Sequence, residues 1–405
     1  MGENMKITSF SEFTQRTSLR MGSGTRILVP DLIEGLGGTR PVLFSDKGLT
    51  NAGLTQQIID IFEAVPGIQL AGVFDEIEQD ARSTNINKGV QYFKECNGDS
   101  IIAIGGGSVL DTAKGIKWAL HKNIKDISLA LQGNAIELWP QARPINIPHV
   151  AIATTAGTGA EVSAIAVIFN ELLGLKCNLI NPFINADIAV LDPDLTIGLP
   201  PRVTAFTGMD ALTHAVEGFF TSKSNPMTDA LALHAIRLIV NNLKTAVTNG
   251  TNVQARSNML QASTLAINSF VLTFGEDPVH NLAHTLGAKY GIPHGLANSV
   301  LLPNVMRHLS YHYLEKINDF AVALDIKNPA NNPEECLSQC IETICQLRKE
   351  VGLPEDYEEF NIDSNDIPQL IPAVQLDPSG IGLRIPDGII EKILKEVIGA
   401  KITVE

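Results

Sequence analysis

Two segments in the second half of the chain carry side chains of the kinds that bind divalent metals. In GMDALTHAVEG, Asp210 and His214 lie four residues apart, and in FGEDPVHNLAHTLGAKYGIPHG the pair His280 and His284 has the same spacing. On a helix this spacing places both side chains on one face, about one turn or roughly 5.4 Å apart. A carboxylate with several imidazoles suits Fe²⁺, Zn²⁺, Mn²⁺ or Ni²⁺. The residues therefore predict a metal site, although hydrogen-bonded Asp–His pairs would show the same spacing.

The second segment also contains His294, which follows His284 by ten residues and lies between Pro293 and Gly295. Spacing alone does not decide which of the three histidines in this segment bind a metal, transfer a proton or pack in the core. The other histidines of the chain have no such neighbours, and each is expected at the surface or capped by a hydrogen bond. These are His121, His149, His234, His308 and His312.

A glycine-rich segment in the first half of the chain, IIAIGGGSVLDTAK, reads as a strand, a tight turn and the start of a helix. Glycines let the backbone approach a ligand closely because no Cβ intervenes. Ser108 follows them where the helix begins, and free N–H groups at that position attract anions. The glycines are Gly105, Gly106 and Gly107. The segment is neither GxGxxG nor a P-loop, so a turn that binds nothing remains open.

Two further positions could serve the same ligand. The loop ATTAGTGAE, residues 153–161, adds the hydroxyl groups of Thr154, Thr155 and Thr158, and two such loops suit a ligand with two phosphates. A polar turn is the alternative. Asp46, in VLFSDKGL, ends the first expected strand, where an acid can accept hydrogen bonds from a ribose diol and repel a 2′-phosphate. A surface Asp that begins a turn fits equally well.

The elements that must position these residues differ between the two halves. Residues 40–200 alternate short apolar runs with helical patterns, which predicts βαβ units and a parallel sheet. Residues 203 to about 350 show apolar residues at helical spacing almost throughout. The pair Pro200-Pro201 marks the boundary, because proline does not continue a helix. We therefore expect an α/β dinucleotide-binding domain over 1–200, an all-helical domain over 201–405, and a binding site in the cleft between them.

Composition restricts the class of protein. The chain has 405 residues, 44% hydrophobic and 18% charged, which is typical of a folded soluble protein of two domains. A net charge of −14 argues against nucleic-acid binding. The sequence shows no secretory signal and no run of eighteen apolar residues, so neither export nor a membrane span is expected.

Five cysteines without a CxxC pair indicate a reducing compartment, the cytoplasm. Three of them, Cys336, Cys340 and Cys345, share one expected helical face. We interpret these three as small core residues rather than as metal-binding thiolates.

The ordered motifs GGGSVLDTAK, TTAGTGAE, GMDALTHAVEG and PHGLANSVLLP resemble the iron-containing (group III) alcohol dehydrogenases, which have the dehydroquinate synthase-like fold, from about residue 18 to about 350. The resemblance implies a metal held by Asp210, His214, His280 and His294. It places His284 beside the nicotinamide and the metal, as a proton relay and not a ligand. The cofactor-binding residues that it implies are Asp46, Gly105, Gly106, Gly107, Ser108, Asp111, Thr154, Thr155, Thr158 and Lys176, with Lys114 completing the glycine motif.

The activity implied by this resemblance is hydride transfer between a small alcohol and NAD(H), with NADP less favoured because of Asp46 and with Fe²⁺ as Lewis acid. Zn²⁺, Mn²⁺ and Ni²⁺ are alternatives to Fe²⁺, and the family's usual state is a homodimer or a larger homo-oligomer. A lyase of the dehydroquinate synthase type is a second hypothesis, but it needs a basic pocket and the helical half has few arginines near its histidines. A non-catalytic metal-stabilised protein is a third.

The sequence departs from the family's pattern in two places. The segment before the metal histidines, FVLTFGEDPVH, brings Phe270, Phe274, Glu276 and Asp277 where small residues and glycine are common. The C-terminal segment QLDPSGIGLRIPDGIIEKIL lacks the frequent Asn-Pro-Arg signature. Both departures put the usual small-alcohol substrate in doubt, and a reductase of an acidic or sulfonated aldehyde is therefore an alternative.

Overall fold

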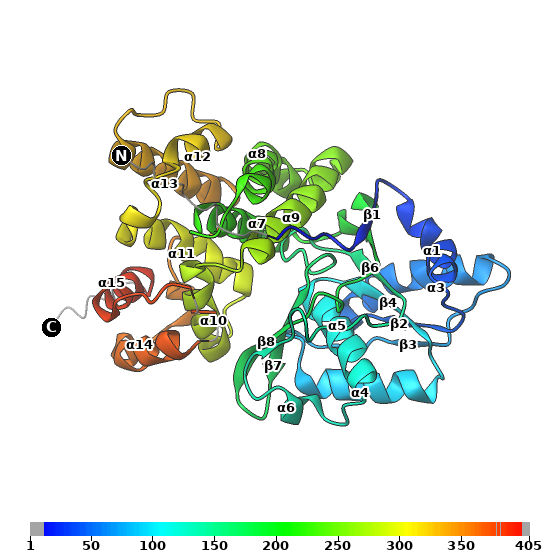
Figure 1. The fold of residues 1–405 in the computed structure, drawn as a ribbon. Coiled ribbons are helices and arrows are strands. Elements are labelled where there is room, and N and C mark those ends of the chain that lie inside the picture. Colours follow the sequence, from blue (N-terminus) through cyan, green and yellow to red (C-terminus); the bar gives the residue numbers. More distant parts are fainter. Residues whose placement is uncertain (1–11, 378, 381, 399–405) are drawn as a thin grey trace, which may run out of the picture.

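The computed structural model describes residues 12–377, 379–380 and 382–398. Its first half contains a six-stranded parallel sheet with the order β1-β9-β6-β4-β2-β3, flanked by helices (Figure 1). The strands are β1 (Ser18–Met21), β2 (Pro41–Phe44), β3 (Gly72–Phe74), β4 (Ser100–Gly105), β6 (His149–Ala153) and β9 (Ile188–Leu191). The expected parallel sheet is confirmed.

Both faces of this sheet are covered, as the alternation along β4 shows. Ile102 and Ile104 pack against one set of helices, and Ile101 and Ala103 pack against the other. The first face is covered by α1 (Val29–Gly35), which follows η1 (Thr25–Leu28), and by α3 (Leu54–Ala64), which follows α2 (Lys47–Asn51). The second is covered by α4 (Ser83–Glu95), α5 (Gly107–Lys122) and α6 (Ile127–Ala130). Apolar side chains on both faces explain why the strands read as continuous hydrophobic runs.

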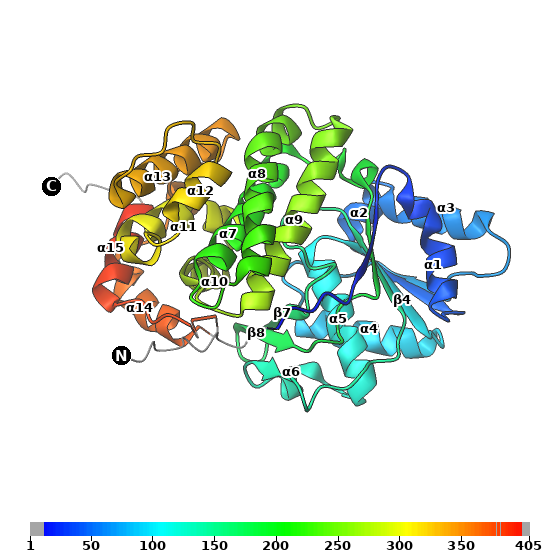
Figure 2. The same ribbon diagram turned by 45° about the horizontal axis from the view of Figure 1, so that its top comes forward.

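A smaller sheet was not expected from the sequence. It consists of β5 (Ala135–Ile136), β8 (Leu175–Ile180) and β7 (Ile165–Asn170), with β7 and β8 antiparallel. Only every second residue of β7 is buried, so it lacks the continuous burial of the main strands. Figure 2 shows this sheet beside α5, on the side of the first half that faces α10.

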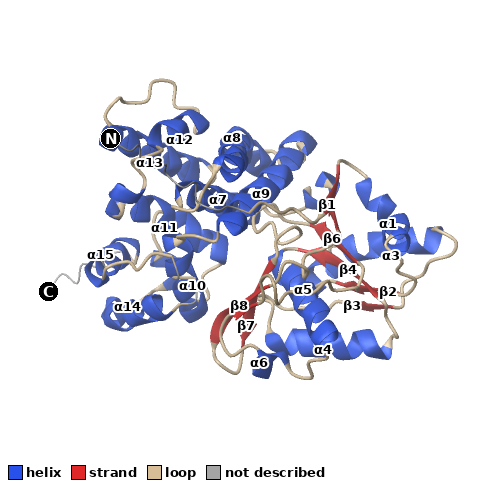
Figure 3. Cartoon of the chain, viewed as in Figure 1, coloured by secondary structure: helices blue, strands red, loops and turns tan. Residues whose placement is uncertain are grey.

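After Leu191 the described chain is helical, as Figure 3 shows by its colours. The helices are α7 (Pro201–Phe220), α8 (Pro226–Thr248), α9 (Val253–Thr273), α10 (Pro278–Tyr290), α11 (His294–His308), α12 (Ile317–Ala323), α13 (Pro333–Glu350), α14 (Ile367–Leu376) and α15 (Asp387–Val397), with the 3-10 turns η2 (Pro193–Thr196), η3 (Ser310–His312), η4 (Glu358–Phe360) and η5 (Ser364–Asp366). Helices α7, α8, α10 and α13 begin with proline, whose fixed φ suits the first helical position. The expected fold class is confirmed, and the domain division at 200/201 stays a prediction.

Cys336 and Cys340 are buried in the core on α13, as interpreted from their spacing. His149 was expected at the surface or capped, and this was wrong: it begins the central strand β6 and is 1% exposed. Neither of its ring nitrogens has a hydrogen-bond partner in the described structure. Burial, followed by the charges of Lys117 and Lys114, lowers the pKa of His149 well below its usual value and keeps the ring neutral.

None of the described helices combines the length and hydropathy needed to cross a membrane.

Candidate active site

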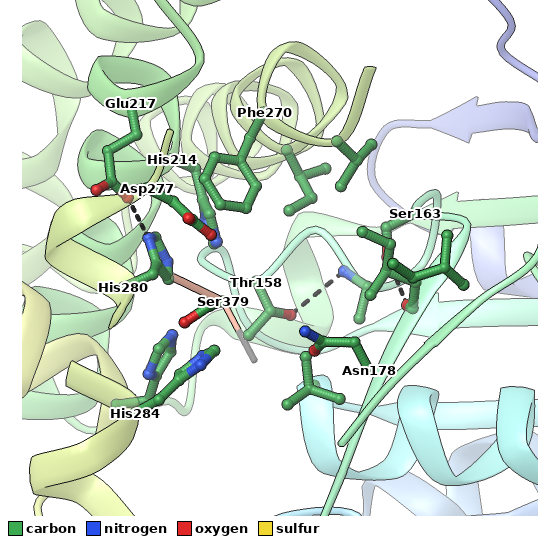
Figure 4. Close-up of a pocket in the computed structure, with 18 of the residues that line it drawn as sticks. Thr158, Ser163, Asn178, His214, Glu217, Phe270, Asp277, His280, His284 and Ser379 are labelled. Atoms are coloured by element: carbon green, nitrogen blue, oxygen red, sulfur yellow. Dashed lines mark hydrogen bonds and ion pairs between the residues drawn. The ribbon is translucent and has the colours of Figure 1, made fainter. Parts of the chain in front are cut away.

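A cavity of about 260 Å³ lies between the α/β half and the helical half. Its α/β wall includes the start of α5 and the β7–β8 hairpin, and its helical wall includes α7, α9 and α10 (Figure 4). The predicted site residues that line it are Gly107, Ser108, Asp111, Thr158, Lys176, Asp210, His214, His280, His284 and His294. The remaining cofactor positions, Asp46, Gly105, Gly106, Thr154 and Thr155, do not line this cavity.

Three of the four predicted metal ligands converge at one end of this cavity. Asp210 comes from the middle of α7, His280 from the first turn of α10, and His294 is the first residue of α11. Their ligand atoms all lie within 4.8 Å of one another. Asp210 Oδ1 is 3.9 Å from His280 Nε2 and 3.6 Å from His294 Nε2. Ligand atoms bound at about 2.1 Å to one cation lie roughly 3–4 Å apart, so the three residues fit a divalent metal.

Asn298, one turn after His294, supports this fit. Its amide nitrogen is 2.7 Å from Asp210 Oδ1, 3.2 Å from His280 Nε2 and 3.3 Å from His294 Nε2. Three acceptor atoms therefore point at one position, which is the arrangement that a bound cation requires. Nothing in the sequence singled out Asn298, although its position four residues after His294 places both on one face of α11.

His214 lies next to this cluster, but its nitrogens fall outside the group of three. Its ring stacks on that of His280, with centroids 4.6 Å apart. His214 Nδ1 is buried and has no partner among the described residues. An unpaired buried nitrogen is costly unless a ligand satisfies it, so His214 as fourth metal ligand stays a prediction that this observation favours.

Burial sets the charge of the cluster. It raises the pKa of Asp210, lowers that of His214 to about 4, and lowers those of His280 and His294 well below the usual value. The imidazoles are therefore neutral at pH 7, as metal coordination requires.

Glu217 also belongs to this site, although the sequence motifs did not identify it. Its carboxylate is 2% exposed; one oxygen contacts His280 Nδ1, and the other accepts a hydrogen bond from the N–H of Val279 at 2.6 Å. A carboxylate on Nδ1 fixes the ring and leaves Nε2 free as a ligand atom. Burial raises the pKa of Glu217 to about 8, and a divalent cation held by His280 would favour its ionised carboxylate. Its spacing was a usable signal, because Asp210, His214 and Glu217 are at i, i+4 and i+7 on one helix.

His284 is held from the C-terminal segment. Its Nδ1 is 3.5 Å from Asp377 Oδ1, and Asp377 in turn accepts hydrogen bonds from the Ser379 hydroxyl group and the Ser379 N–H. The His284 ring centroid is 5.2 Å from that of His294, so the ring lies beside the metal cluster. Asp377 lies 93 residues from His284 in sequence, and no spacing pattern connects them.

The glycine loop after β4 is as tight as expected. A Cβ on Gly105 would lie 2.5 Å from Val109 Cβ, and one on Gly107 would lie 2.8 Å from Thr158 Cγ2. The Thr154 N–H donates to the Gly105 carbonyl at 3.1 Å, which joins this loop to the loop after β6. The two predicted loops are therefore adjacent at the carboxyl edge of the sheet, and α5 begins between them.

Asp46 lies at the same edge, after β2, which pairs with β4. The chain proceeds from β2 to β3 on one side and from β4 to β6 on the other, so the strand order reverses between β2 and β4. Ligands of open parallel sheets bind at such a point. One Asp46 oxygen accepts from the Leu49 N–H at 2.9 Å and caps α2. The capping role is established, and ribose binding stays a prediction.

Asp111, Lys114 and Lys176 make contacts within the protein. Lys114 is 1% exposed and lies 2.8 Å from Asp111, whose second oxygen accepts from the Val167 N–H at 3.0 Å. These bonds fasten β7 to α5. Lys176 lines the cavity and pairs with Asp80 at 2.9 Å.

The residues that depart from the family's pattern do line the cavity. Phe270 packs on the rings of His214 and His280, with centroid distances of 5.0 and 4.9 Å. Glu276 is held by Thr221 and by the N–H and hydroxyl group of Ser222 at 2.8 and 2.5 Å. Burial alone would raise the pKa of Glu276, but the hydrogen bonds outweigh it and lower the pKa to about 2.

Comparison with known proteins identifies this arrangement. Residues 16–193 match the family model described as iron-containing alcohol dehydrogenase, and residues 204–379 match the C-terminal model of the same family. The 1,3-propanediol dehydrogenase of Klebsiella pneumoniae is 37% identical over 83% of this chain and 84% of its own length. The NAD-dependent methanol dehydrogenase of Bacillus methanolicus is 33% identical over 86% and 88%.

The fold agrees with these matches. A crystal structure of a 1,3-propanediol oxidoreductase covers 95% of this chain and 99% of its own, with a TM-score of 0.87 and 32% identity. The expected oxidoreductase class, the nicotinamide cofactor and the iron are thereby confirmed at the level of the family. The lyase hypothesis loses its support, because both halves of the chain match the dehydrogenase models. The chain belongs to the iron-containing alcohol dehydrogenase family.

Proposed function

We propose that this protein interconverts a small alcohol and its aldehyde, with NAD(H) as hydride carrier and Fe²⁺ as the metal. The observation that carries the proposal is the shared cavity. The ligand atoms of Asp210, His280 and His294 and the turn at Gly107 and Ser108, which we predict to bind phosphate, open into one space. Hydride transfer needs the substrate and the nicotinamide to be held together in that way.

The roles of the residues follow from their positions. Asp210, His280 and His294, with His214 as fourth ligand, would hold the cation. The pyrophosphate of NAD would lie on the loops after β4 and β6, with the ribose diol near Asp46. When bound, the cation supplies polarisation of the substrate oxygen and NAD supplies a hydride acceptor.

His284 takes up the hydroxyl proton of the alcohol and passes it towards solvent. Its Nδ1 faces Asp377 at 3.5 Å, which favours a ring orientation that leaves Nε2 for the proton. Phe270 covers the other side of the cluster and excludes water from the reacting carbon. In the reverse direction the same residues serve aldehyde reduction.

We also propose a homodimer or larger homo-oligomer in the cytoplasm. Self-association of the chain is supported by exposed apolar side chains near one edge of the main sheet, Met21, Ile27 and Leu28. A cytoplasmic location is supported by the five cysteines, all of which are free thiols. Light scattering on the purified protein tests the first proposal.

The function is tested with protein reconstituted anaerobically with Fe²⁺, and with Zn²⁺, Mn²⁺ or Ni²⁺ in parallel. We expect nicotinamide reduction with small primary alcohols, a preference for NAD over NADP, and loss of turnover after chelation that added Fe²⁺ restores. Full activity of protein shown to be metal-free would refute the metal's role. Absence of any nicotinamide oxidation or reduction across alcohols and aldehydes, with metal bound, would refute the function.

A further inference from the structure

Asp277 occupies the N-cap position of α10 but does not cap it. An Asp at this position ordinarily accepts hydrogen bonds from N–H groups of the first turn. In this helix Pro278 has no N–H, and Glu217 accepts from the N–H groups of Val279, at 2.6 Å, and of His280. The first turn is therefore satisfied from another helix, and the Asp277 carboxyl group has no structural task there.

The Asp277 carboxyl group has no other partner within residues 12–377, 379–380 and 382–398. The N–H of its own residue interacts favourably with it, but more weakly than the neighbouring acids Glu217 and Asp377 repel it. Its charged neighbours are Glu217, Asp377 and Glu276, all of them acids. Burial, followed by repulsion from Glu217 and Asp377, raises the pKa of Asp277 well above its usual value. A partly buried carboxyl group in such surroundings is costly to keep unless it serves a ligand.

The carboxyl group faces the cavity. Asp277 lies one helical turn before His280, so its side chain is on the metal side of α10, and it is among the residues that line the cavity (Figure 4). Apolar side chains of Ile267, Phe270 and Val271 form the adjoining wall. A substrate whose reacting oxygen lies at Asp210 and His280 therefore shares this cavity with the Asp277 carboxyl group, which no other side chain of the described residues engages.

The charges in this cavity disfavour an anionic substrate. Of the described lysines that line it, Lys176 is paired with Asp80 at 2.9 Å and Lys223 donates to the Phe274 carbonyl at 3.1 Å. A sulfonated or carboxylated aldehyde would meet the ionised Glu276, whose pKa is about 2, without an unengaged cation to offset it. A hydroxyl group fits either protonation state of Asp277, because an oxygen that accepts a hydrogen bond is present in both. An ammonium group needs the ionised form, which the neighbouring acids disfavour.

We propose that Asp277 binds a second hydroxyl group of the substrate, so that this protein acts on short diols and the corresponding hydroxyaldehydes rather than on simple alcohols or anionic aldehydes. This inference rests on the proposed function and adds its substrate class. Asp277 is the specificity-determining residue, and the metal ligands and His284 serve diols and simple alcohols alike.

The test compares wild type with Asp277→Ala and with Asp277→Asn, which keeps an amide oxygen as acceptor. For each, kcat/KM is measured with 1,3-propanediol, 1,2-propanediol, 1-propanol and 3-amino-1-propanol, and calorimetry measures binding of 1,3-propanediol to the metal-loaded protein. We expect Asp277→Ala to lose about 10–100-fold in kcat/KM for a diol and less than about threefold for 1-propanol, as for removal of one hydrogen bond to a substrate hydroxyl. Diol binding should weaken in parallel, and Asp277→Asn should keep most of the preference.

If Asp277→Ala has the same ratio of kcat/KM for a diol to kcat/KM for 1-propanol as wild type, the inference is wrong. It is also wrong if wild type prefers 3-amino-1-propanol and Asp277→Ala loses that preference. Inactivity of wild type towards every substrate, with metal bound, would refute the proposed function instead. Metal content and thermal unfolding are measured for all variants. If Asp277→Ala does not fold, Asp277→Ser, with a side chain that suits an N-cap but is too short to reach as far, gives the same comparison.

Discussion

Glu217→Gln is expected to weaken metal binding without removing any ligand. In the wild type the Glu217 carboxylate faces His280 Nδ1 and also accepts from the Val279 N–H at 2.6 Å. The ring proton is thereby kept on Nδ1, and Nε2 is left as the free ligand atom opposite Asp210, 3.9 Å away. Glutamine has a single acceptor oxygen, so it can serve Val279 or His280 but not both.

The magnitude follows from these two bonds. A hydrogen bond that involves a charged group contributes about 1.5–3 kcal/mol. A difference of 1.4 kcal/mol corresponds to about tenfold in an equilibrium constant. Metal affinity should therefore fall by roughly 10–100-fold, which is the range for outer partners of metal-binding histidines.

The assay is competition for Zn²⁺ or Co²⁺ between metal-free protein and a chromogenic chelator. Asp377→Asn is the matched control, because it makes the same carboxyl-to-amide change beside His284, which is not a predicted ligand. We expect its affinity to stay within about twofold of wild type, and thermal unfolding checks that both variants fold. Wild-type affinity in Glu217→Gln would refute the reasoning, and equal losses in both variants would indicate a general effect of charge instead.

Three further predictions concern the same cavity. His280→Ala should lose metal, whereas His284→Ala should keep metal and lose about 10²–10⁴-fold in turnover, as for a missing acid–base group. Metal analysis and steady-state kinetics measure both effects, and the reverse pattern would contradict these roles. Asp46→Ser, which keeps a capping oxygen for α2, should raise kcat/KM with NADPH relative to NADH by roughly tenfold if the charge repels a 2′-phosphate; an unchanged ratio would exclude that role. Glu276 has a pKa of about 2 in the folded protein and an unfolded value near 4.3, so its stabilisation is present above about pH 4 and is lost as the pH falls towards 2. After discounting for its partial exposure, Glu276→Gln should cost about 1–2 kcal/mol in unfolding free energy at pH 7 and little at pH 2, and a pH-independent cost would contradict the assignment.

Local patterns predicted the parts of this protein that depend on neighbouring residues. The apolar runs of β4 and β6 and the glycines after β4 identified the sheet and its loops. The i, i+4 spacing identified Asp210 and His280 as residues on inward helix faces. The β7–β8 hairpin was not predicted, because it lies outside the main sheet: β7 packs against α5, β8 meets α10, and only every second residue of β7 is buried.

Contacts between distant segments could not be read in this way. His280 and His284 share the same helical spacing, so the sequence alone does not distinguish them. In the tertiary structure Glu217 from α7 contacts His280, whereas Asp377 from the segment after α14 lies beside His284. The burial of His149 had the same origin, since nothing local to it shows that β6 lies at the centre of the sheet.

Glu217 connects metal binding with substrate choice through a single carboxylate. Because it satisfies the first turn of α10, it both orients His280 and relieves Asp277 of its capping role. A variant that lacks Glu217 leaves the Val279 N–H unpaired beside a free Asp277 carboxyl group, which can then turn back to cap the helix. Glu217→Ala is therefore expected to lower the preference for a diol over 1-propanol as well as the affinity for metal, even when metal is added in excess. A loss of metal affinity with an unchanged diol preference at full metal occupancy would show that the two roles are independent.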